Sequence, residues 1–336
     1  MTKLHVPDPS SAGLLLTYNC TSECRHCMYA CSPRWKPDWI PEKDANTTLT
    51  QLAGKIQGLE GNRIGVNCGL HLTGGEPFMN FDLLLEVTRM ARELKIPSTF
   101  VETNCFWCTN DNTTRERLVE LRSGGLHGIL ISVNPFILEQ VPFERTERAA
   151  RIGGEVFGGN AMIYQEFFYE QFKRLGIKEE LPFEKYLQKA GPHSLRYVEL
   201  LPMGRAPYKL GHLYRRYSAR QFFGESCRSE LTRDWHVHID NYGNYVTGYC
   251  AGISLGDARD LDSISEMDLE EKPILDALVT GLARLWKLAV DEFSYNELPS
   301  GYVSKCHLCV DIRKHIMQQT DQFKELKPRE FYSYLD

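Results

Sequence analysis

The sequence predicts an α/β protein with a parallel sheet, open or rolled into a partial barrel, and a smaller module after it. Short apolar segments alternate with segments of helical periodicity in the first 205 residues. This alternation is the pattern of parallel strands joined by crossover helices. After Arg205 the pattern changes to a hairpin signal followed by helices. We therefore assign residues 1–205 to the α/β domain and residues 206–336 to a C-terminal module.

Five segments of the first part are predicted strands, because each is a short apolar run: 14–18, 70–73, 100–103, 129–133 and 197–201. Amphipathic helices are expected between them, at 49–59, 82–94 and 115–123, and Gly124 and Gly125 supply a stop for the last one. The stretch 156–194 is rich in aromatic residues and reads as mostly helical, without an assignable strand. We interpret it as core or as an insertion, with a substrate lid as the alternative.

In the C-terminal module, residues 235–240 and 245–250 flank the turn sequence Asn-Tyr-Gly-Asn, which predicts a β-hairpin. Helices are expected at 273–290 and 310–319. His236 and His238 alternate along the first hairpin strand and so share one face. They are either metal ligands or residues that pack against the hairpin or lie on the surface.

Composition limits the class of protein. The chain has 336 residues, a net charge of −5 and no apolar run of the about 18 residues needed to span a membrane. Its first residues lack the features of a signal peptide. We expect a cytoplasmic protein that binds neither nucleic acid nor membrane. Eleven cysteines in a reducing compartment indicate a metal, either in iron–sulfur clusters or as structural zinc.

The first cysteine motif is Cys20, Cys24 and Cys27, in a C-x3-C-x2-C spacing directly after the first predicted strand. Three thiolates can bind three irons of a cubane cluster and leave the fourth iron open to an exchangeable ligand. A structural zinc site usually needs four protein ligands instead. A second motif, Gly74-Gly75-Glu76-Pro77, follows the second predicted strand.

Together the two motifs resemble the radical S-adenosylmethionine (SAM) superfamily. The resemblance implies a partial (β/α)6 barrel and a 4Fe–4S cluster held by Cys20, Cys24 and Cys27, with SAM on the open iron. It implies that the glycine-rich turn contacts the SAM amino group, and that SAM is also bound by residues at other strand ends. These cofactor-binding residues are His26, Gly74, Gly75, Glu76, Pro77, Asn104, Ser132 and Asn134. The family often has glycine where this chain has Cys105.

A second set of cysteines, Cys227, Cys250, Cys306 and Cys309, resembles the auxiliary-cluster module called twitch, a reduced form of the SPASM module. A full SPASM module uses seven cysteines for two clusters, so four imply one auxiliary 4Fe–4S cluster. A four-cysteine zinc site is the alternative. The family usually has a glycine five residues before the second of these cysteines, whereas Gly243 lies seven before Cys250.

Further polar residues are expected near the site. Cys105 and Cys108 form a C-x2-C pair that is a catalytic thiol pair, a ligand set for a further metal, or a pair of buried packing residues. Glu199 is either a substrate-side base or a structural carboxylate paired with Arg196 or Arg205. Strand alternation directs the following side chains to the interior: His71, Glu102, Asn104, Ser132, Asn134, Tyr197 and Glu199.

The resemblance implies an enzyme that takes one electron from a flavodoxin- or ferredoxin-type donor and cleaves SAM to a 5′-deoxyadenosyl radical. That radical would abstract a hydrogen atom from a polar substrate, with a net oxidation assisted by the auxiliary cluster. The substrate is a small molecule or, alternatively, a peptide presented by a separate recognition protein. A third interpretation is a non-catalytic iron–sulfur electron carrier or a zinc-stabilised protein, but neither needs the turn at 74–77.

Overall fold

The computed structural model describes residues 3–198 and 200–336. The chain divides into two compact units. The sheet unit consists of Ser10–Cys24 and Cys31–Glu199, and the C-terminal unit consists of Met1–Pro9, Arg25–Ala30 and Leu200–Asp336. The short segment that carries Cys27 therefore groups with the C-terminal unit.

The sheet unit contains five parallel strands in the order β6-β5-β4-β3-β2. Their bounds are β2 (Ser11–Leu15), β3 (Gly69–Thr73), β4 (Phe100–Thr103), β5 (Gly128–Ser132) and β6 (Ala161–Tyr164). In register, His71 lies opposite Phe100 and Ser132 lies opposite Tyr164. The predicted α/β fold with a parallel sheet is confirmed, and the carboxyl ends of these strands meet at one edge, where sites of such folds lie.

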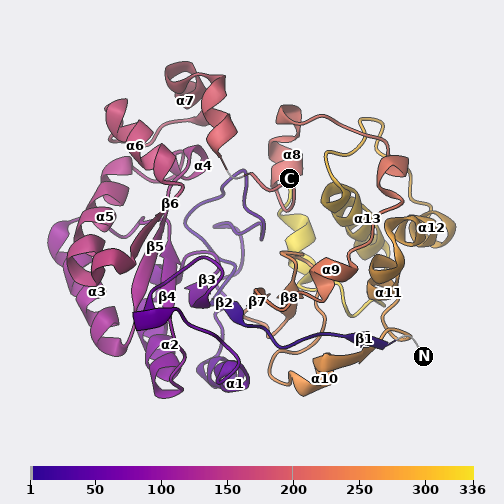
Figure 1. Ribbon diagram of the computed structural model, residues 1–336. Coiled ribbons are helices and arrows are strands. Elements are labelled where there is room, and N and C mark those ends of the chain that lie inside the picture. The colour runs from indigo at the N-terminus through magenta and orange to yellow at the C-terminus, as the bar shows by residue number, and fades with distance from the viewer. Residues whose placement is uncertain (1–2, 199) are drawn as a thin grey trace. The chain divides into compact units, whose positions relative to one another are not determined.

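Helices connect the strands: α1 (Glu42–Leu52), α2 (Phe81–Glu93), α3 (Asp111–Gly124), α4 (Pro135–Leu138), α5 (Phe143–Phe157), α6 (Glu166–Arg174) and α7 (Phe183–Ala190). Short 3-10 helices are η1 (Glu60–Asn62), η2 (Pro77–Asn80), η3 (Gly158–Asn160) and η4 (Pro192–Tyr197). Helices α2, α3 and α5 lie side by side along the sheet (Figure 1). The predicted helix stop is confirmed, because Gly125 ends α3 in the left-handed region at φ 116°.

Several predicted bounds in the sheet unit were wrong. The strand predicted at 14–18 lies three residues earlier, and the helix predicted at 49–59 ends at Leu52. The stretch 156–194 does contain a strand, β6, which its flanking glycines and half-buried residues concealed. The strand predicted at 197–201 is not formed by its described residues: Tyr197 ends η4, is 61% exposed and stacks on Phe167. Glu199 lies outside the described residues.

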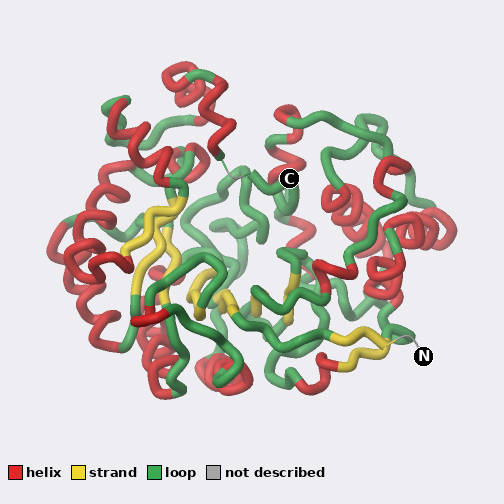
Figure 2. The backbone as a smooth tube through the Cα atoms, viewed as in Figure 1, coloured by secondary structure: helices red, strands yellow, loops and turns green. Residues whose placement is uncertain are grey.

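The C-terminal unit is mostly helix and loop, with short strands (Figure 2). Its strands are β1 (Lys3–His5), β7 (Val237–Ile239), β8 (Tyr245–Thr247) and β9 (Glu266–Asp268). Strands β1 and β9 pair antiparallel, and so do β7 and β8. The predicted hairpin is confirmed: Asp240 Oδ1 accepts hydrogen bonds from the backbone N–H groups of Tyr242 and Asn244 across its turn.

The longer helices of this unit are α11 (Pro273–Thr280), α12 (Leu282–Phe293) and α13 (Lys305–Gln319), and the shorter ones are α8 (Ala206–Lys209), α9 (Arg228–Leu231), α10 (Asp262–Ser265), η5 (Gly211–Leu213), η6 (Ala219–Phe222) and η7 (Arg329–Ser333). The helix predicted at 273–290 is two helices, because Gly281 adopts φ 154° between them. The helix predicted at 310–319 begins earlier, at Lys305. No helix in the described part of the chain is long and apolar enough to cross a membrane.

One face of the sheet changes from apolar to polar along its strands. Ile64, Phe100 and Leu130 form a buried apolar cluster on it. Two residues further along β4, Glu102 approaches His71 Nδ1 at 3.0 Å and accepts a hydrogen bond from Thr73 Oγ1 at 2.7 Å. The predicted shared face of His71 and Glu102 is thus confirmed.

Candidate functional site

Cys20 stands at the start of a loop that is fixed at both ends. Its backbone N–H donates to the carbonyl of Ser32, 3.2 Å away, which joins the outgoing and returning parts of the loop. Asn19 Nδ2 donates to the carbonyl of Trp35 at 2.7 Å. The Trp35 ring stacks on Tyr18 at a centroid distance of 4.5 Å. The first cysteine is therefore held in place by the protein itself.

The sulfur of Cys20 accepts N–H groups. The Ser22 backbone N–H donates to Cys20 Sγ at 3.4 Å, and Asn104 Nδ2 lies 3.8 Å from the same sulfur. Asn104 Nδ2 also donates to the Thr21 and Ser22 hydroxyls at 3.1 and 3.2 Å. Donors aimed at a sulfur favour its thiolate form and orient it as a metal ligand. These residues fit a thiolate bound to iron.

The turn at 74–77 packs directly on the base of this loop. Gly75 N–H donates to Thr17 O at 2.8 Å, and Glu76 N–H donates to Asn19 O at 3.2 Å. A Cβ on Gly75 would lie only 1.8 Å from Asn19 O, and one on Gly74 only 2.3 Å from Thr17 O. Both glycines are required by this close approach of two backbones, in addition to any approach of a ligand.

Glu76 is a buried carboxylate with three hydrogen-bond donors. Its Oε2 accepts from the Asn104 backbone N–H at 2.8 Å. Its Oε1 accepts from Thr103 Oγ1 at 2.9 Å and from the Phe78 backbone N–H at 3.2 Å. Burial raises the pKa of Glu76 to about 7, although these hydrogen bonds lower it in part. A cation placed beside this carboxylate would favour its ionised form.

Thr103 connects Glu76 to the Cys105 turn. Thr103 Oγ1 accepts hydrogen bonds from Cys105 N–H and from Trp107 Nε1, both at 3.0 Å. Cys105 adopts the left-handed region at φ 69°, the conformation that a glycine at this position would supply at no steric cost. The chain thus forms a left-handed turn with a cysteine at the position where the resemblance implies a glycine.

Cys105 and Cys108 are both fully buried. Burial raises the pKa of the Cys105 thiol well above its ordinary value, and its hydrogen bond with Cys108 raises it further. Reactive cysteines have lowered pKa values and are partly exposed. These properties favour the packing interpretation of the pair over a catalytic thiol.

The polar residues at the end of β5 differ in their roles. Ser132 ends the strand and is half-buried. Asn134 is buried and caps α4, because its Oδ1 accepts the backbone N–H groups of Phe136 and Ile137 at 3.0 and 3.1 Å. The cap thus uses the side-chain oxygen of Asn134, a residue that was expected to bind SAM.

The segment Arg25–Ala30 is held within the C-terminal unit by two neighbouring residues. The guanidinium of Arg205 is fully buried and donates from Nη2 to Ala30 O at 2.7 Å, while the Arg205 backbone N–H donates to Cys27 O at 3.1 Å. A Cβ on Gly204 would lie 2.4 Å from Met28 O. Burial and the charge of Arg205 lower the pKa of His26 to about 4, which keeps this ring neutral at pH 7.

The four cysteines of the second set lie together in the C-terminal unit. Cys227 directly precedes α9, Cys250 follows β8, and Cys306 and Cys309 lie in the first two turns of α13. Burial, with the charge of Cys309 as a smaller cause, raises the pKa of Cys250 to about 11 and that of Cys306 to about 12. Burial and the charges of the other three cysteines likewise raise the pKa of the Cys227 thiol. Crowded buried thiols of this kind become stable thiolates only when a metal binds them.

One buried cation accompanies the four cysteines. Arg313 donates to Ala251 O at 3.2 Å and to Tyr332 Oη at 2.9 Å, and its positive charge lowers the pKa of Cys250 and Cys306 in part. The donor set can hold either a 4Fe–4S cluster or a zinc ion.

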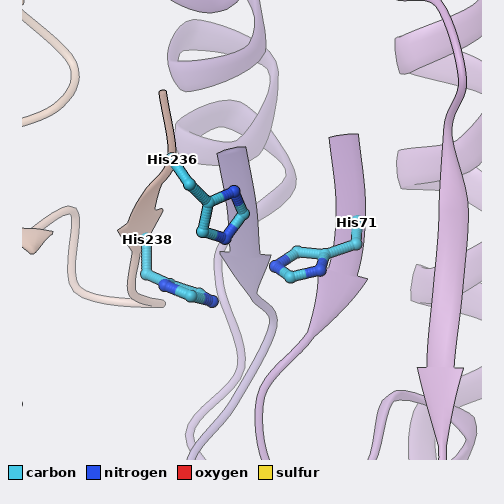
Figure 3. A group of neighbouring side chains, drawn as sticks. All are labelled: His71, His236 and His238. Carbon is cyan, nitrogen blue, oxygen red and sulfur yellow. The ribbon is translucent and has the colours of Figure 1, made fainter. Parts of the chain in front are cut away.

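His236 and His238 are both buried, and their rings extend to the same side of β7 (Figure 3). Their centroids lie 4.8 Å apart at 84°. His238 also contacts Tyr29 and Tyr249, at 5.1 and 5.7 Å. The shared face is confirmed, and both rings make aromatic contacts within the C-terminal unit. His71 projects from β3 (Figure 3). Its Nδ1 lies 3.0 Å from Glu102 Oε1.

Two residues of the site were not predicted in their observed roles. Thr103 was expected only as part of a strand, and Arg205 only as a possible partner of Glu199. A hydroxyl shared by three groups and a fully buried guanidinium depend on distant segments of the chain. Their only signal in the sequence is their position beside Asn104 and Gly204.

Comparison with known proteins supports the expected family. Residues 14–136 match the model of the Radical SAM superfamily. No curated protein matches the sequence. The chain is similar to the solved structure of BtrN in complex with AdoMet and 2-DOIA, at 12% identity and a TM-score of 0.42, over 82% of this chain and 89% of that one.

It is also similar to native anSMEcpe with bound AdoMet and Cp18Cys peptide, at 12% identity and a TM-score of 0.45, over 97% of this chain and 96% of that one. Both TM-scores lie below 0.5, so these similarities carry no functional argument. The family model spans Cys20, Cys24, Cys27 and the turn at 74–77, whose packing is described above. The similarity to the Radical SAM superfamily therefore extends over residues 14–136 of this chain.

Proposed function

We propose that the chain binds SAM and cleaves it reductively, and that the resulting 5′-deoxyadenosyl radical abstracts a hydrogen atom from a polar substrate. A 4Fe–4S cluster on Cys20, Cys24 and Cys27 would supply the electron for this cleavage when bound. The observation that carries the proposal is the direct packing of the Gly74–Pro77 turn on the base of the Cys20 loop. A non-catalytic electron carrier has no need of this turn.

Glu76 and the strand ends would bind SAM. The buried Glu76 carboxylate fits a positively charged amino group, because an ammonium beside it would offset its burial. Asn104 would fix the cysteine loop through its contacts with Thr21 and Ser22. Ser132 and His26 remain proposed contacts to the rest of SAM.

We further propose that Cys227, Cys250, Cys306 and Cys309 hold an auxiliary 4Fe–4S cluster. Four thiolates would complete its coordination and leave no site for substrate, which suits a role in electron transfer. An acceptor of this kind fits a net oxidation, such as a dehydrogenation or the formation of a new bond. Zinc on the same four thiolates is the alternative, and it would exclude the electron-acceptor role.

The polar lining of the sheet supports a polar substrate. His71, Thr73 and Glu102 form a polar set beyond the apolar cluster, in which Glu102 accepts a hydrogen bond from Thr73 and approaches His71 Nδ1. A polar small molecule suits such a surface, and a peptide presented by a separate protein is the second candidate. Glu199 remains a proposed base and lies outside the described residues.

The function is tested by adding SAM and dithionite to the anaerobically reconstituted protein and measuring 5′-deoxyadenosine and methionine. We expect both products from the wild type and neither from a variant in which Cys20, Cys24 and Cys27 are alanine. A variant with alanine at the four C-terminal cysteines should still form them if it folds, as judged by its circular dichroism. Absence of 5′-deoxyadenosine from a wild-type protein that contains iron and sulfide would reject the proposal.

A further inference from the structure

A groove in the sheet unit opens beside the Cys20 loop. It has a volume of about 540 Å³ and is bordered by Thr21, the residue directly after Cys20. The other residues that line it come from η2, the Cys105 turn, α3 and α5: Phe78, Met79, Phe106, Trp107, Thr109, Thr113, Arg117 and Arg145. None of these lining residues is an aspartate or a glutamate.

The floor of the groove is aromatic and partly open to solvent. Phe78 stacks on Trp107 at a centroid distance of 3.9 Å and an angle of 12°. Met79 beside them is 39% exposed, and Phe106 is half-buried. Aromatic residues, methionine and arginine are enriched in the centres of protein interfaces. The groove, with an exposed methionine beside stacked aromatic rings, has the composition of such an interface centre.

Two arginines border this floor and are held in place without an acidic partner. The Arg117 guanidinium lies 5.1 Å from the Phe81 ring and 5.8 Å from the Trp107 ring. Arg145 Nη1 donates to the carbonyl of Phe106 at 2.6 Å. Among the described residues, neither arginine forms an ion pair with a carboxylate. The groove therefore presents two fixed positive charges to a ligand.

The position of Arg145 is not explained by a favourable interaction with a helix dipole, as that of other arginines in this unit is. Arg92 and Arg122 lie in the last turns of α2 and α3, where a cation offsets the negative end of the helix. Arg145 instead lies in the first turn of α5, where the helix end is positive and a cation is unfavourable. A negatively charged ligand would relieve this repulsion.

The groove is also connected to the Cys20 sulfur by a short set of contacts. The Phe106 N–H on its border donates to Asn104 Oδ1 at 2.9 Å. Asn104 Nδ2 then contacts Thr21 Oγ1 at 3.1 Å and Cys20 Sγ at 3.8 Å. A molecule seated in the groove is thus separated from the sulfur by few residues.

We propose that this groove is the docking surface for an acidic protein that donates one electron to the cluster on the Cys20 loop. The proposal rests on the proposed function, because only that function requires such a donor. Acidic side chains of the donor would pair with Arg117 and Arg145, and apolar groups around its redox centre would cover Met79. The donor loses one electron and the cluster gains it, with no bond made or broken.

The test measures reduction of the reconstituted enzyme by a reduced flavodoxin in an anaerobic stopped-flow instrument, followed by the loss of cluster absorbance. Arg117→Gln removes one charge, and Met79→Asp places a negative charge on the floor. Both leave Arg145 and the loop it supports intact. Arg92→Gln, at the far end of α2, is the matched control. Dithionite, a small reductant that needs no docking site, is used with every variant.

We expect the second-order rate constant with flavodoxin to fall at least about tenfold in Arg117→Gln and in Met79→Asp, and to fall in the wild type as salt is added. Arg92→Gln should behave as the wild type, and dithionite should reduce all four proteins equally. Wild-type rates in both groove variants would overturn the proposal. Equal slowing in all three variants would also overturn it, because long-range charge alone would then suffice.

The two proposals fail in different ways. If dithionite and SAM give no 5′-deoxyadenosine with the wild type, the proposed function fails, and the docking surface with it. If dithionite supports the reaction in every variant while flavodoxin reduces every variant at the same rate, only the docking surface is rejected.

Discussion

Glu76 Oε2 accepts a hydrogen bond from the Asn104 backbone N–H at 2.8 Å. This bond joins the glycine-rich turn after β3 to the end of β4, and the Asn104 side chain continues to the Cys20 loop. Asn104 therefore contacts both the Glu76 carboxylate and the first cysteine. Substitutions at Glu76, Thr103 or Gly75 should therefore alter the positions of the turn at 74–77, the end of β4 and the Cys20 loop.

The stability of the SAM-free protein should depend on the ionisation of Glu76. Its pKa is raised from about 4.5 in the unfolded chain to about 7 in the folded protein, so the folded state keeps a proton that the unfolded state loses. The free energy of unfolding should be highest below pH 4.5 in this respect and should fall by about 3 kcal/mol as the pH rises through 7. Glu76→Gln should remove this dependence.

The measurement is urea unfolding from pH 5 to pH 8 of the wild type and of Glu76→Gln, with Glu86→Gln on the exposed face of α2 as control. The wild type and the control should lose stability with rising pH relative to Glu76→Gln. Parallel curves for all three proteins would show that Glu76 is ionised throughout this range.

Thr103→Val should destabilise the protein by about 2–3 kcal/mol. The change keeps the shape of the side chain but leaves the N–H groups of Cys105 and Trp107 and one oxygen of Glu76 without their shared partner. Urea unfolding measures the difference, and Thr50→Val on the exposed side of α1 serves as control. A loss below about 0.5 kcal/mol would mean that the three groups find other partners.

Gly75→Ala should abolish SAM binding and lower the iron content of the reconstituted protein. The new Cβ would lie 1.8 Å from Asn19 O, so the turn or the Cys20 loop must move. Gly154→Ala is the matched control, because it lies in α5 with nothing within 4 Å of the added atom. That variant should gain up to about 1 kcal/mol of stability. Equal SAM affinity in both variants would contradict the packing described here.

Cys105→Gly distinguishes a packing residue from a catalytic thiol. Glycine adopts φ 69° without strain. The variant protein should therefore fold with a stability within about 1 kcal/mol of that of the wild type, and it should still cleave SAM. Once a substrate is identified, its turnover should also persist. Loss of substrate turnover with intact SAM cleavage would instead assign the thiol to the chemistry.

The parts of the fold that follow from local pattern were predictable. Strands β3, β4 and β5 are apolar runs whose bounds lie within a residue of those expected. Strand β6 was missed because its four residues are half-buried and follow two glycines. Tyr197 was assigned to a strand because apolar alternation cannot show that Phe167 holds its ring at the surface.

The site residues that belong to contiguous sequence motifs could be predicted. The cysteine spacing and the turn at 74–77 were readable because ligand spacing and glycine requirements are local. The hydrogen bonds of Thr103 and of the buried Arg205 could not be predicted, because each residue connects segments that only the fold brings together. The requirement for glycine at position 75 was expected from the approach of a ligand, but in the structure the nearest neighbour is the Asn19 backbone.

The most direct test of the account is the iron and sulfide content of the anaerobically reconstituted protein, beside that of the variant with alanine at Cys20, Cys24 and Cys27. Two cubane clusters predict about eight irons in the wild type and about four in the variant. About four irons falling to none, with zinc retained, would contradict the auxiliary cluster and the electron-acceptor role that depends on it.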